Sequence, residues 1–311
     1  MLTVGEVHTG LLQNATALAQ ADCRRILNLV EGETVLCSQR PTAYAVSPDI
    51  PTGVDCWLPS ASGRQVRGVG AVVSHAIITG GRVLQASSSA RIERSAVNRR
   101  LPWSHYLSRP GQLEAIGKVD WSDMARGFLH GSSPNSLNLS AITVRVMDTV
   151  QTSGHLDRRP PFRTQRTRLR WTVTTVEEGH PSAGTALFTV ESDTLRTVDL
   201  VVGRDDVAAA LGLCEDLALH DWLLTTLAAL VEIIISSPST AAEKAARLRP
   251  VVEHLLHLWM PGGRVQDSVM PVWDAIERSP GFSRQWNASV NWIRDQVAAG
   301  TMALLQACVS R

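Results

Sequence analysis

The hydrophobic pattern of this chain changes near Gly203, and that change limits the possible folds more than any other feature. Before it, short runs with apolar residues at every second position alternate with turn residues. After it, apolar residues recur every three or four positions. The first period is that of strands and the second that of helices. We therefore expect an α+β fold, with a β-rich region containing antiparallel hairpins over residues 1–203 and an all-α bundle over residues 204–311.

The clearest strand signal is the pair Gly80-Gly81, which separates two β-type runs, 71–79 and 82–92. Because glycine adopts positive φ without strain, this pair predicts a hairpin turn. Other alternating or β-rich runs predict strands over residues 2–9, 142–150, 169–173, 186–190 and 194–202, and a modest apolar period predicts a helix over residues 15–30. Stretches rich in Pro, Gly and Ser predict loops over residues 47–63, 132–136 and 154–161.

The apolar stretch 217–235 has the length of a membrane span. It belongs to a helix that Asp205 or Asp206 is expected to cap. The stretch contains one histidine and two acidic residues. Each such group costs about 2.5–3.5 kcal/mol in the middle of a membrane, which cancels most of the gain from the apolar residues. We therefore expect a buried core helix and no membrane span.

Three more helices are expected after this one. Thr240 and Glu243 have the spacing of a capping box, and Pro250 predicts a kink or a restart. Another helix is expected from Asp267, and the longest from Ser283. That last helix has an apolar seam formed by Trp286, Val290, Ile293, Val297, Leu304 and Cys308. The seam predicts either a core-facing helix or a coiled-coil contact, and the second alternative implies a homo-oligomer through residues 283–309.

Charge is distributed unevenly, although 30 basic and 29 acidic residues leave a net charge of +1. The net charge is −3 over residues 1–63, +11 over residues 64–170 and −7 over residues 171–311. Nearly all of the positive charge is arginine, because Lys118 and Lys244 are the only lysines. A basic middle region followed by an acidic helical region indicates either an internal match of charge or an anionic partner.

The densest basic segment precedes Trp171 and holds six arginines. These candidate anion- or partner-binding residues are Arg158, Arg159, Arg163, Arg166, Arg168 and Arg170. In a strand the last three would share one face, with Leu169 and Trp171 directed to the core. Their guanidinium groups suit phosphates and carboxylates, and Phe162 is a candidate for stacking on a base. Three interpretations stay open: a face matched by the acidic helices, a charged edge strand that resists aggregation, or a surface for an anionic partner.

A second candidate binding segment is the loop RRLPWSHYLSRPG, residues 99–111. Arg99, Arg100, Trp103 and His105 place cations, an indole and an imidazole within a few positions of one another. This combination suits an anion or a planar ligand. The alternative is a structural loop anchored by its tryptophan.

Cofactor and catalytic motifs are incomplete in this sequence. The segment 111–118 has five residues between its glycines, where a phosphate-binding loop has four, and Val119 follows the lysine in place of Ser or Thr. The segment 68–70 lacks the third glycine of the dinucleotide fingerprint. Five widely spaced cysteines without a CxxC pair predict neither a disulfide framework nor a zinc site. We expect no catalytic residue, cofactor or metal.

Three phrases carry a family resemblance: TGVDCWLPSASG (52–63), VRGVGAVVSHAIITGGRVLQ (66–85) and HLWMPGG with PVWDAIERSPGFSRQWNASVNWIRDQ (257–296). They resemble a family of conserved actinobacterial proteins of unknown function, encoded beside a P-loop ATPase-like protein and a predicted methyltransferase. The resemblance covers nearly the whole chain but supplies no active site. It implies membership of a multi-protein system with a P-loop NTPase as partner.

The sequence thus favours a cytoplasmic, non-enzymatic interaction or assembly subunit whose basic sheet face is the contact surface. The N-terminal segment has neither a basic region nor an uninterrupted apolar run, which fits a cytoplasmic location. Two alternatives remain. One is an enzyme acting on an anionic, phosphate-containing substrate, with the strand arginines as a clamp and His105 as acid or base. The other is a nucleic-acid-binding protein.

Overall fold

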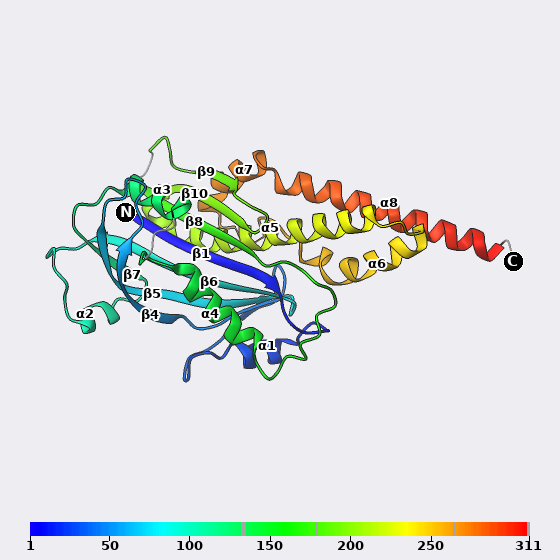
Figure 1. Cartoon of the computed structure of the whole chain (residues 1–311), viewed down its shortest axis with the longest axis horizontal. Coiled ribbons are helices and arrows are strands. Elements are labelled where there is room, and N and C mark those ends of the chain that lie inside the picture. Colours follow the sequence, from blue (N-terminus) through cyan, green and yellow to red (C-terminus); the bar gives the residue numbers. More distant parts are fainter. Residues whose placement is uncertain (132–134, 178–179, 264, 310–311) are drawn as a thin grey trace.

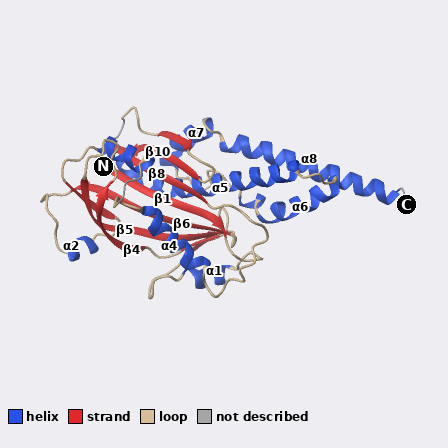
Figure 2. Cartoon of the chain, viewed as in Figure 1, coloured by secondary structure: helices blue, strands red, loops and turns tan. Residues whose placement is uncertain are grey.

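A ten-stranded mixed sheet occupies the N-terminal two thirds of the chain in the computed structural model (Figures 1 and 2), which describes residues 1–131, 135–177, 180–263 and 265–309. Its strands are β1 (Leu2–Leu11), β2 (Leu36–Ser38), β3 (Tyr44–Val46), β4 (Ile50–Leu58), β5 (Val66–Thr79), β6 (Val83–Arg94), β7 (Gln112–Ile116), β8 (Thr167–Val176), β9 (Thr185–Val190) and β10 (Leu195–Gly203). The order across the sheet is β2-β3-β5-β7-β6-β1-β8-β10-β9, and β4 pairs with β5. The pairs β6–β7 and β8–β10 are parallel, and the other pairs are antiparallel.

The predicted hairpin at Gly80-Gly81 is confirmed, with φ of 60° and 63° at the two glycines. Its long first strand, β5, pairs with β6 over residues 73–79 and with β7 over residues 67–70. At this end of the hairpin β5 and β6 are apart, and the short strand β7 lies between them and pairs with both. Gly70 permits this insertion, because a Cβ atom there would overlap the carbonyl oxygen of Gln112.

Helices cover both faces of the sheet (Figure 2). On one face, α3 (Trp121–His130) and α4 (Leu139–Gln151) pack on the central strands, in a cluster that includes Val4 and Phe128. On the other face, α5 (Val207–Ser236) and α7 (Met270–Arg278) pack on a cluster that includes Val7 and Trp171. Gly5 makes room for that tryptophan, because a Cβ atom at this position would overlap the indole ring.

The C-terminal helices continue beyond the sheet as an elongated projection (Figure 1). It consists of the later part of α5, α6 (Ala241–His254) and α8 (Phe282–Val309), which share an apolar cluster with Leu11 of β1. Two short helices, α1 (Gln20–Leu27) and α2 (Trp103–Leu107), lie beside the sheet. Three 3₁₀ turns occupy Arg204–Asp206, Leu256–Leu258 and Asp267–Val269. The expected α+β class is confirmed.

The strand expected over residues 142–150 is wrong, because this segment belongs to helix α4. Its β-branched residues favour a strand, yet the buried positions Leu139, Thr143, Val146 and Val150 recur every three or four residues. Asn138 starts the helix by accepting a hydrogen bond from the backbone N–H of Ala141 at 3.0 Å. Packing on the sheet and this cap outweigh the weak strand preference of the segment.

The loop expected over residues 47–63 is also wrong in part, since it contains strand β4. Pro51 and Gly53 suggested a turn, but β4 pairs with β5 and has no second partner strand among the described residues. Proline is tolerated in such a strand because its missing N–H need not reach a neighbour. The loop over residues 154–161 is confirmed, and residues 132–134 of the other expected loop lie outside the described residues.

The helical predictions after residue 203 agree with the structure in most respects. The capping box of Thr240 and Glu243 is present, but α6 runs through Pro250 without restarting. The helix expected over residues 15–30 is shorter, from Gln20 to Leu27. By length and composition, the described helix Arg204–Ile234 could cross a membrane. More than half of its most apolar window is buried in the protein, and its first half packs on β1 and β8, as a core helix does.

Candidate functional site

Strand β8 divides its side chains between the two faces of the sheet as the sequence predicts. Leu169 and Trp171 are buried under α5, each with about 1% of its surface exposed. Arg168 and Arg170 therefore lie on the opposite face, beneath α3 and α4, where both are partly buried. Their position beneath two helices differs from the open basic sheet face that the sequence suggested.

These two arginines line a pocket of about 540 Å³ between α3 and α4, called here the α3–α4 pocket. Its floor is formed by β1 and β8, and the first turn of α4 forms one wall. Its residues are Glu6, Pro59, Phe128, Gly131, Asn135, Ser136, Leu137, Asn138, Leu139, Ser140, Ala141, Val144, Arg168 and Arg170. The pocket thus combines charged groups from the sheet with apolar side chains from both helices.

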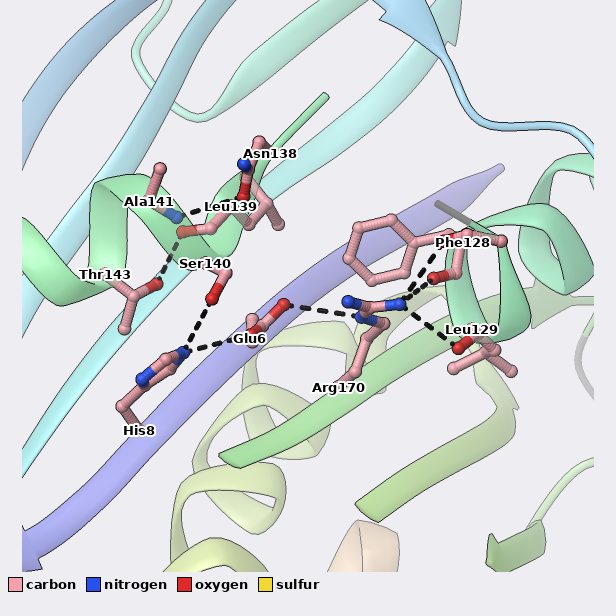
Figure 3. A network of polar contacts seen from close by, with 11 residues as sticks. Glu6, His8, Phe128, Leu129, Asn138, Leu139, Ser140, Ala141, Thr143 and Arg170 are labelled. Atoms are coloured by element: carbon pink, nitrogen blue, oxygen red, sulfur yellow. Dashed lines mark hydrogen bonds and ion pairs between the residues drawn. The ribbon is translucent and has the colours of Figure 1, made fainter. Parts of the chain in front are cut away.

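A buried polar network lies on the floor of the α3–α4 pocket (Figure 3). Nε2 of His8 donates to Oε1 of Glu6 at 3.0 Å, and Oγ of Ser140 lies 3.1 Å from the same nitrogen. Nε of Arg170 donates to the other oxygen of Glu6 at 3.3 Å. The same guanidinium donates to the carbonyl oxygens of Phe128 and Leu129 near the C-terminal end of α3, at 3.1 and 3.3 Å. The network therefore joins β1, β8, α3 and α4.

The electrostatics of Glu6 favour binding over proton transfer. Burial alone would raise the pKa of this carboxyl, but hydrogen bonds from His8 and Ser140 and the charge of Arg170 hold its pKa below the usual range. A carboxylate stabilised in this way is a weak proton acceptor. Both Ser140 and Glu6 approach the same nitrogen of His8, whereas a serine nucleophile and its orienting acid contact opposite nitrogens of the imidazole.

Arg168 differs from Arg170 in its contacts. Within the described residues, its guanidinium has no hydrogen bond or ion pair, although it borders the same pocket. The first turn of α4 faces this pocket as well, and Asn138 already occupies the backbone N–H of Ala141. The backbone N–H groups of Leu139 and Ser140 have no acceptor within the helix. The pocket is therefore lined both by the first turn of a helix and by an arginine.

The other four arginines of the basic segment are exposed in the connection between α4 and β8, called here the arginine segment (residues 158–166). Arg158 donates to the carbonyl oxygen of Thr152 at 3.4 Å, and Arg166 donates to Asp148 at 3.1 Å. Arg159 and Arg163 have no side-chain partner in the described part of the chain. Among the described residues these four arginines form one ion pair, between Arg166 and Asp148, and the carboxylate of Asp157 beside them accepts from the backbone N–H groups of Ala15 and Arg159.

Two of the three interpretations of these arginines disagree with the structure. Among the described residues, no ion pair joins the arginine segment to the acidic helices after residue 203. An internal match of charge is therefore not formed there. Strand β8 lies between β1 and β10, so its arginines do not protect a sheet edge.

Phe162 does not occupy the position that base stacking requires. Its ring stacks on the imidazole of His254, with centroids 6.3 Å apart and planes inclined by 18°. It also packs against the apolar cluster of the helical projection. The arginine segment is anchored by this contact, which takes up part of the ring surface that a base would need.

The loop around Trp103 is tied to the sheet by several contacts. The Trp103 ring packs over Gly53, and the Arg100 guanidinium lies 5.1 Å from the ring centroid. Arg100 also donates to Asp55 at 3.0 Å, and Tyr106 accepts a hydrogen bond from the backbone of Leu101. These contacts favour the structural-loop interpretation for Arg100 and Trp103, while Arg99 is exposed.

His105 does not share a pocket with Arg168 and Arg170, as the enzyme hypothesis required. Its Nε2 pairs with Oε1 of Glu114 at 2.7 Å, and Arg109 contacts both groups. Glu114 alternates along β7 with Leu113 and Ala115, which face the α3–α4 side. His105 is therefore on the opposite face of the sheet from Arg168 and Arg170. The expected single pocket with these arginines as clamp and His105 as acid or base is wrong.

Glu6, His8 and Ser140 were missed as candidate residues. A signal was present in β1, where Glu6 and His8 occupy one face of an otherwise apolar run. All ten positions of this strand are buried, so two polar residues on one face indicate a buried polar network.

In the described part of the chain, no group of three or more His, Cys, Asp or Glu is arranged to hold a metal ion. No protein-family model, curated protein or solved structure matches this chain.

Proposed function

We propose that this chain is a cytoplasmic, non-enzymatic interaction or assembly subunit that contacts an acidic protein surface through its arginine segment. One observation carries the proposal. The segment exposes Arg158, Arg159, Arg163 and Arg166, and the one ion pair that these arginines form among the described residues joins Arg166 to Asp148.

Such a surface favours association with an oppositely charged partner. Arginine is enriched at protein interfaces, and complementary charge raises the rate of encounter and selects the partner. The anchor of Phe162 on His254 holds the segment against the helical projection. A fixed segment loses less conformational entropy on binding than a free one does.

A protein partner is favoured over the two alternatives. Nucleic-acid binding by stacking would need an aromatic ring beside the arginines, and Phe162 is occupied. Catalysis on an anionic substrate would need a suitable acid or base beside Arg168 and Arg170, but His105 is on the other face and Glu6 is a weak base. The resemblance to an actinobacterial family with a P-loop NTPase neighbour suggests the class of partner. We propose that such an NTPase presents an acidic surface to this chain.

The far end of α8 is a second contact surface in this proposal, for a homo-oligomer. Trp286 and Ile293, in the first half of its seam, are buried in the projection. The last seam residues, Leu304 and Cys308, have side chains outside the described part of the structure, and their neighbours Met302 and Leu305 are exposed, each with 62% of its surface accessible. A contact between copies would therefore use the end of the range 283–309 and not its whole length.

The direct test compares two sets of charge substitutions of equal size. In the triple variant Arg158→Gln, Arg159→Gln and Arg163→Gln, we expect capture of the partner from host extract at low salt to fall about tenfold or more. The matched control is Arg278→Gln, Arg284→Gln and Arg294→Gln, which removes three exposed arginines from α7 and α8. Equal capture by both triple variants would contradict the assignment of the arginine segment.

A further inference from the structure

We propose that the α3–α4 pocket is a binding site for a small phosphate monoester, held by Arg168 and the first turn of α4. This site is separate from the arginine segment, and the inference does not depend on the partner contact proposed above. Its evidence is the arrangement of charge, donors and apolar surface within one cavity.

The balance of charge on the pocket floor leaves a positive site. The carboxylate of Glu6, with 2% of its side chain exposed, is neutralised by Arg170, whose position is fixed by the carbonyl groups of α3. Arg168 borders the same cavity and has no ion pair among the described residues. An anion entering the pocket therefore meets a guanidinium whose charge is not already matched.

The donors around Arg168 suit a tetrahedral oxyanion. The first turn of α4 contributes the backbone N–H groups of Leu139 and Ser140 and the positive end of the helix dipole. The hydroxyl of Ser140 lies beside them, at the edge of the polar network. An arginine fork and backbone amides together satisfy several oxygens of one phosphate, whereas a planar carboxylate has two.

The size and lining of the pocket indicate a ligand larger than the phosphate alone. Phe128, Leu137, Leu139 and Val144 supply apolar surface next to the donors. A volume of about 540 Å³ is within the range of small-molecule sites. A phosphate monoester carries a charge of about −1.5 to −2 at pH 7 and can place an apolar or aromatic group against that surface.

Isothermal titration calorimetry with phenyl phosphate on the full chain tests this site. We expect saturable binding, weaker binding of inorganic phosphate, and little binding of benzoate. The variant Arg168→Gln should weaken the affinity for phenyl phosphate about tenfold or more, as loss of a charge-assisted hydrogen bond does. The control Arg163→Gln removes an exposed arginine of the same charge and should leave the affinity within about twofold.

A second variant covers the case in which Arg168→Gln does not fold. Ser140→Ala removes one hydroxyl from the first turn of α4 and should weaken phenyl phosphate binding in the same direction. No binding of phenyl phosphate, equal binding of benzoate, or equal losses in Arg168→Gln and Arg163→Gln would overturn the proposal. The triple variant of the arginine segment must still bind phenyl phosphate, so failure of the partner contact and failure of this site are distinguishable.

Discussion

His75 on β5 is a charged residue held between two carboxylates. Its Nδ1 lies 3.1 Å from Oδ1 of Asp49, and its Nε2 lies 2.8 Å from Oε1 of Glu215 on α5. Burial opposes the charged form of the imidazole, but the charge of Glu215 and the hydrogen bond to Asp49 raise its pKa to about 10. The pair with Glu215 connects the sheet to the helix that covers it.

This pair predicts a dependence of stability on alkaline pH. Because the pKa of His75 is about 10 in the folded chain and 6.5 in the reference state, its contribution is fully present below pH 6.5. It is lost progressively as the pH rises from 6.5 to about 10. We expect the free energy of unfolding, from urea titrations, to fall across this interval. In His75→Gln the fall should be smaller, and identical pH profiles for the two proteins would contradict the assignment.

At the residue scale, the sequence shows the arginines but not their environment. The alternation of Arg168 and Arg170 with Leu169 correctly predicts which side chains share a face. It does not reveal that α3 and α4 cover that face, because a pattern of period two reports only that two faces differ. The pairing of Glu6 with Arg170 joins residues 164 positions apart, and no local spacing encodes it.

At the scale of elements, helix α4 matters most for the proposed site, because its first turn forms a wall of the α3–α4 pocket. Its N-cap is Asn138, whose Oδ1 accepts from the backbone N–H of Ala141 at 3.0 Å. We expect Asn138→Ala to lower the free energy of unfolding by about 0.5–2 kcal/mol, since the cap is lost. Asn138→Asp keeps an acceptor and should cost much less. Urea unfolding of the three proteins measures this, and equal losses in both variants would show that the cap is not the cause.

Elements whose turn or cap residues specify them locally were predictable from the sequence. Elements whose structure depends on pairing or burial against distant residues were not. The glycine pair 80–81 specifies its hairpin, and Thr240 with Glu243 specifies the start of α6. Strand β4 contains a proline and a glycine, and its pairing with β5 decides its structure. The segment 142–150 is rich in β-branched residues and becomes helical because one face of that helix is buried on the sheet.

At the scale of the whole molecule, the packed core crosses the boundary predicted at residues 203 and 204. One apolar cluster contains Trp171 and Leu200 from the sheet together with Leu213 and Leu217 from α5. The change from strands to helices occurs where the sequence pattern changes, but the sheet depends on α5 to cover its face. A hydrophobic pattern locates the change in element type and does not report which elements share a core.

The same scale explains the division of charge along the chain. Several basic residues of the middle third pair with nearby carboxylates, among them Arg67 with Asp55 and Arg109 with Glu114, and His75 pairs with Glu215 of α5. Among the described residues, the arginine segment itself forms no ion pair with the acidic helices. In our proposal the arginine segment requires an external anionic surface. Such contacts depend strongly on salt, since the screening length falls from about 30 Å at 0.01 M to about 3 Å at 1 M.

Native mass spectrometry of the full chain, purified from its host at low salt, tests that requirement most directly. We expect a stoichiometric complex with a protein partner at low salt, and release of that partner after a high-salt wash. Retained nucleic acid in place of protein would contradict the assignment of the partner. A single unliganded mass that does not change with salt would contradict the central claim, because the arginine segment would then have no external partner to meet.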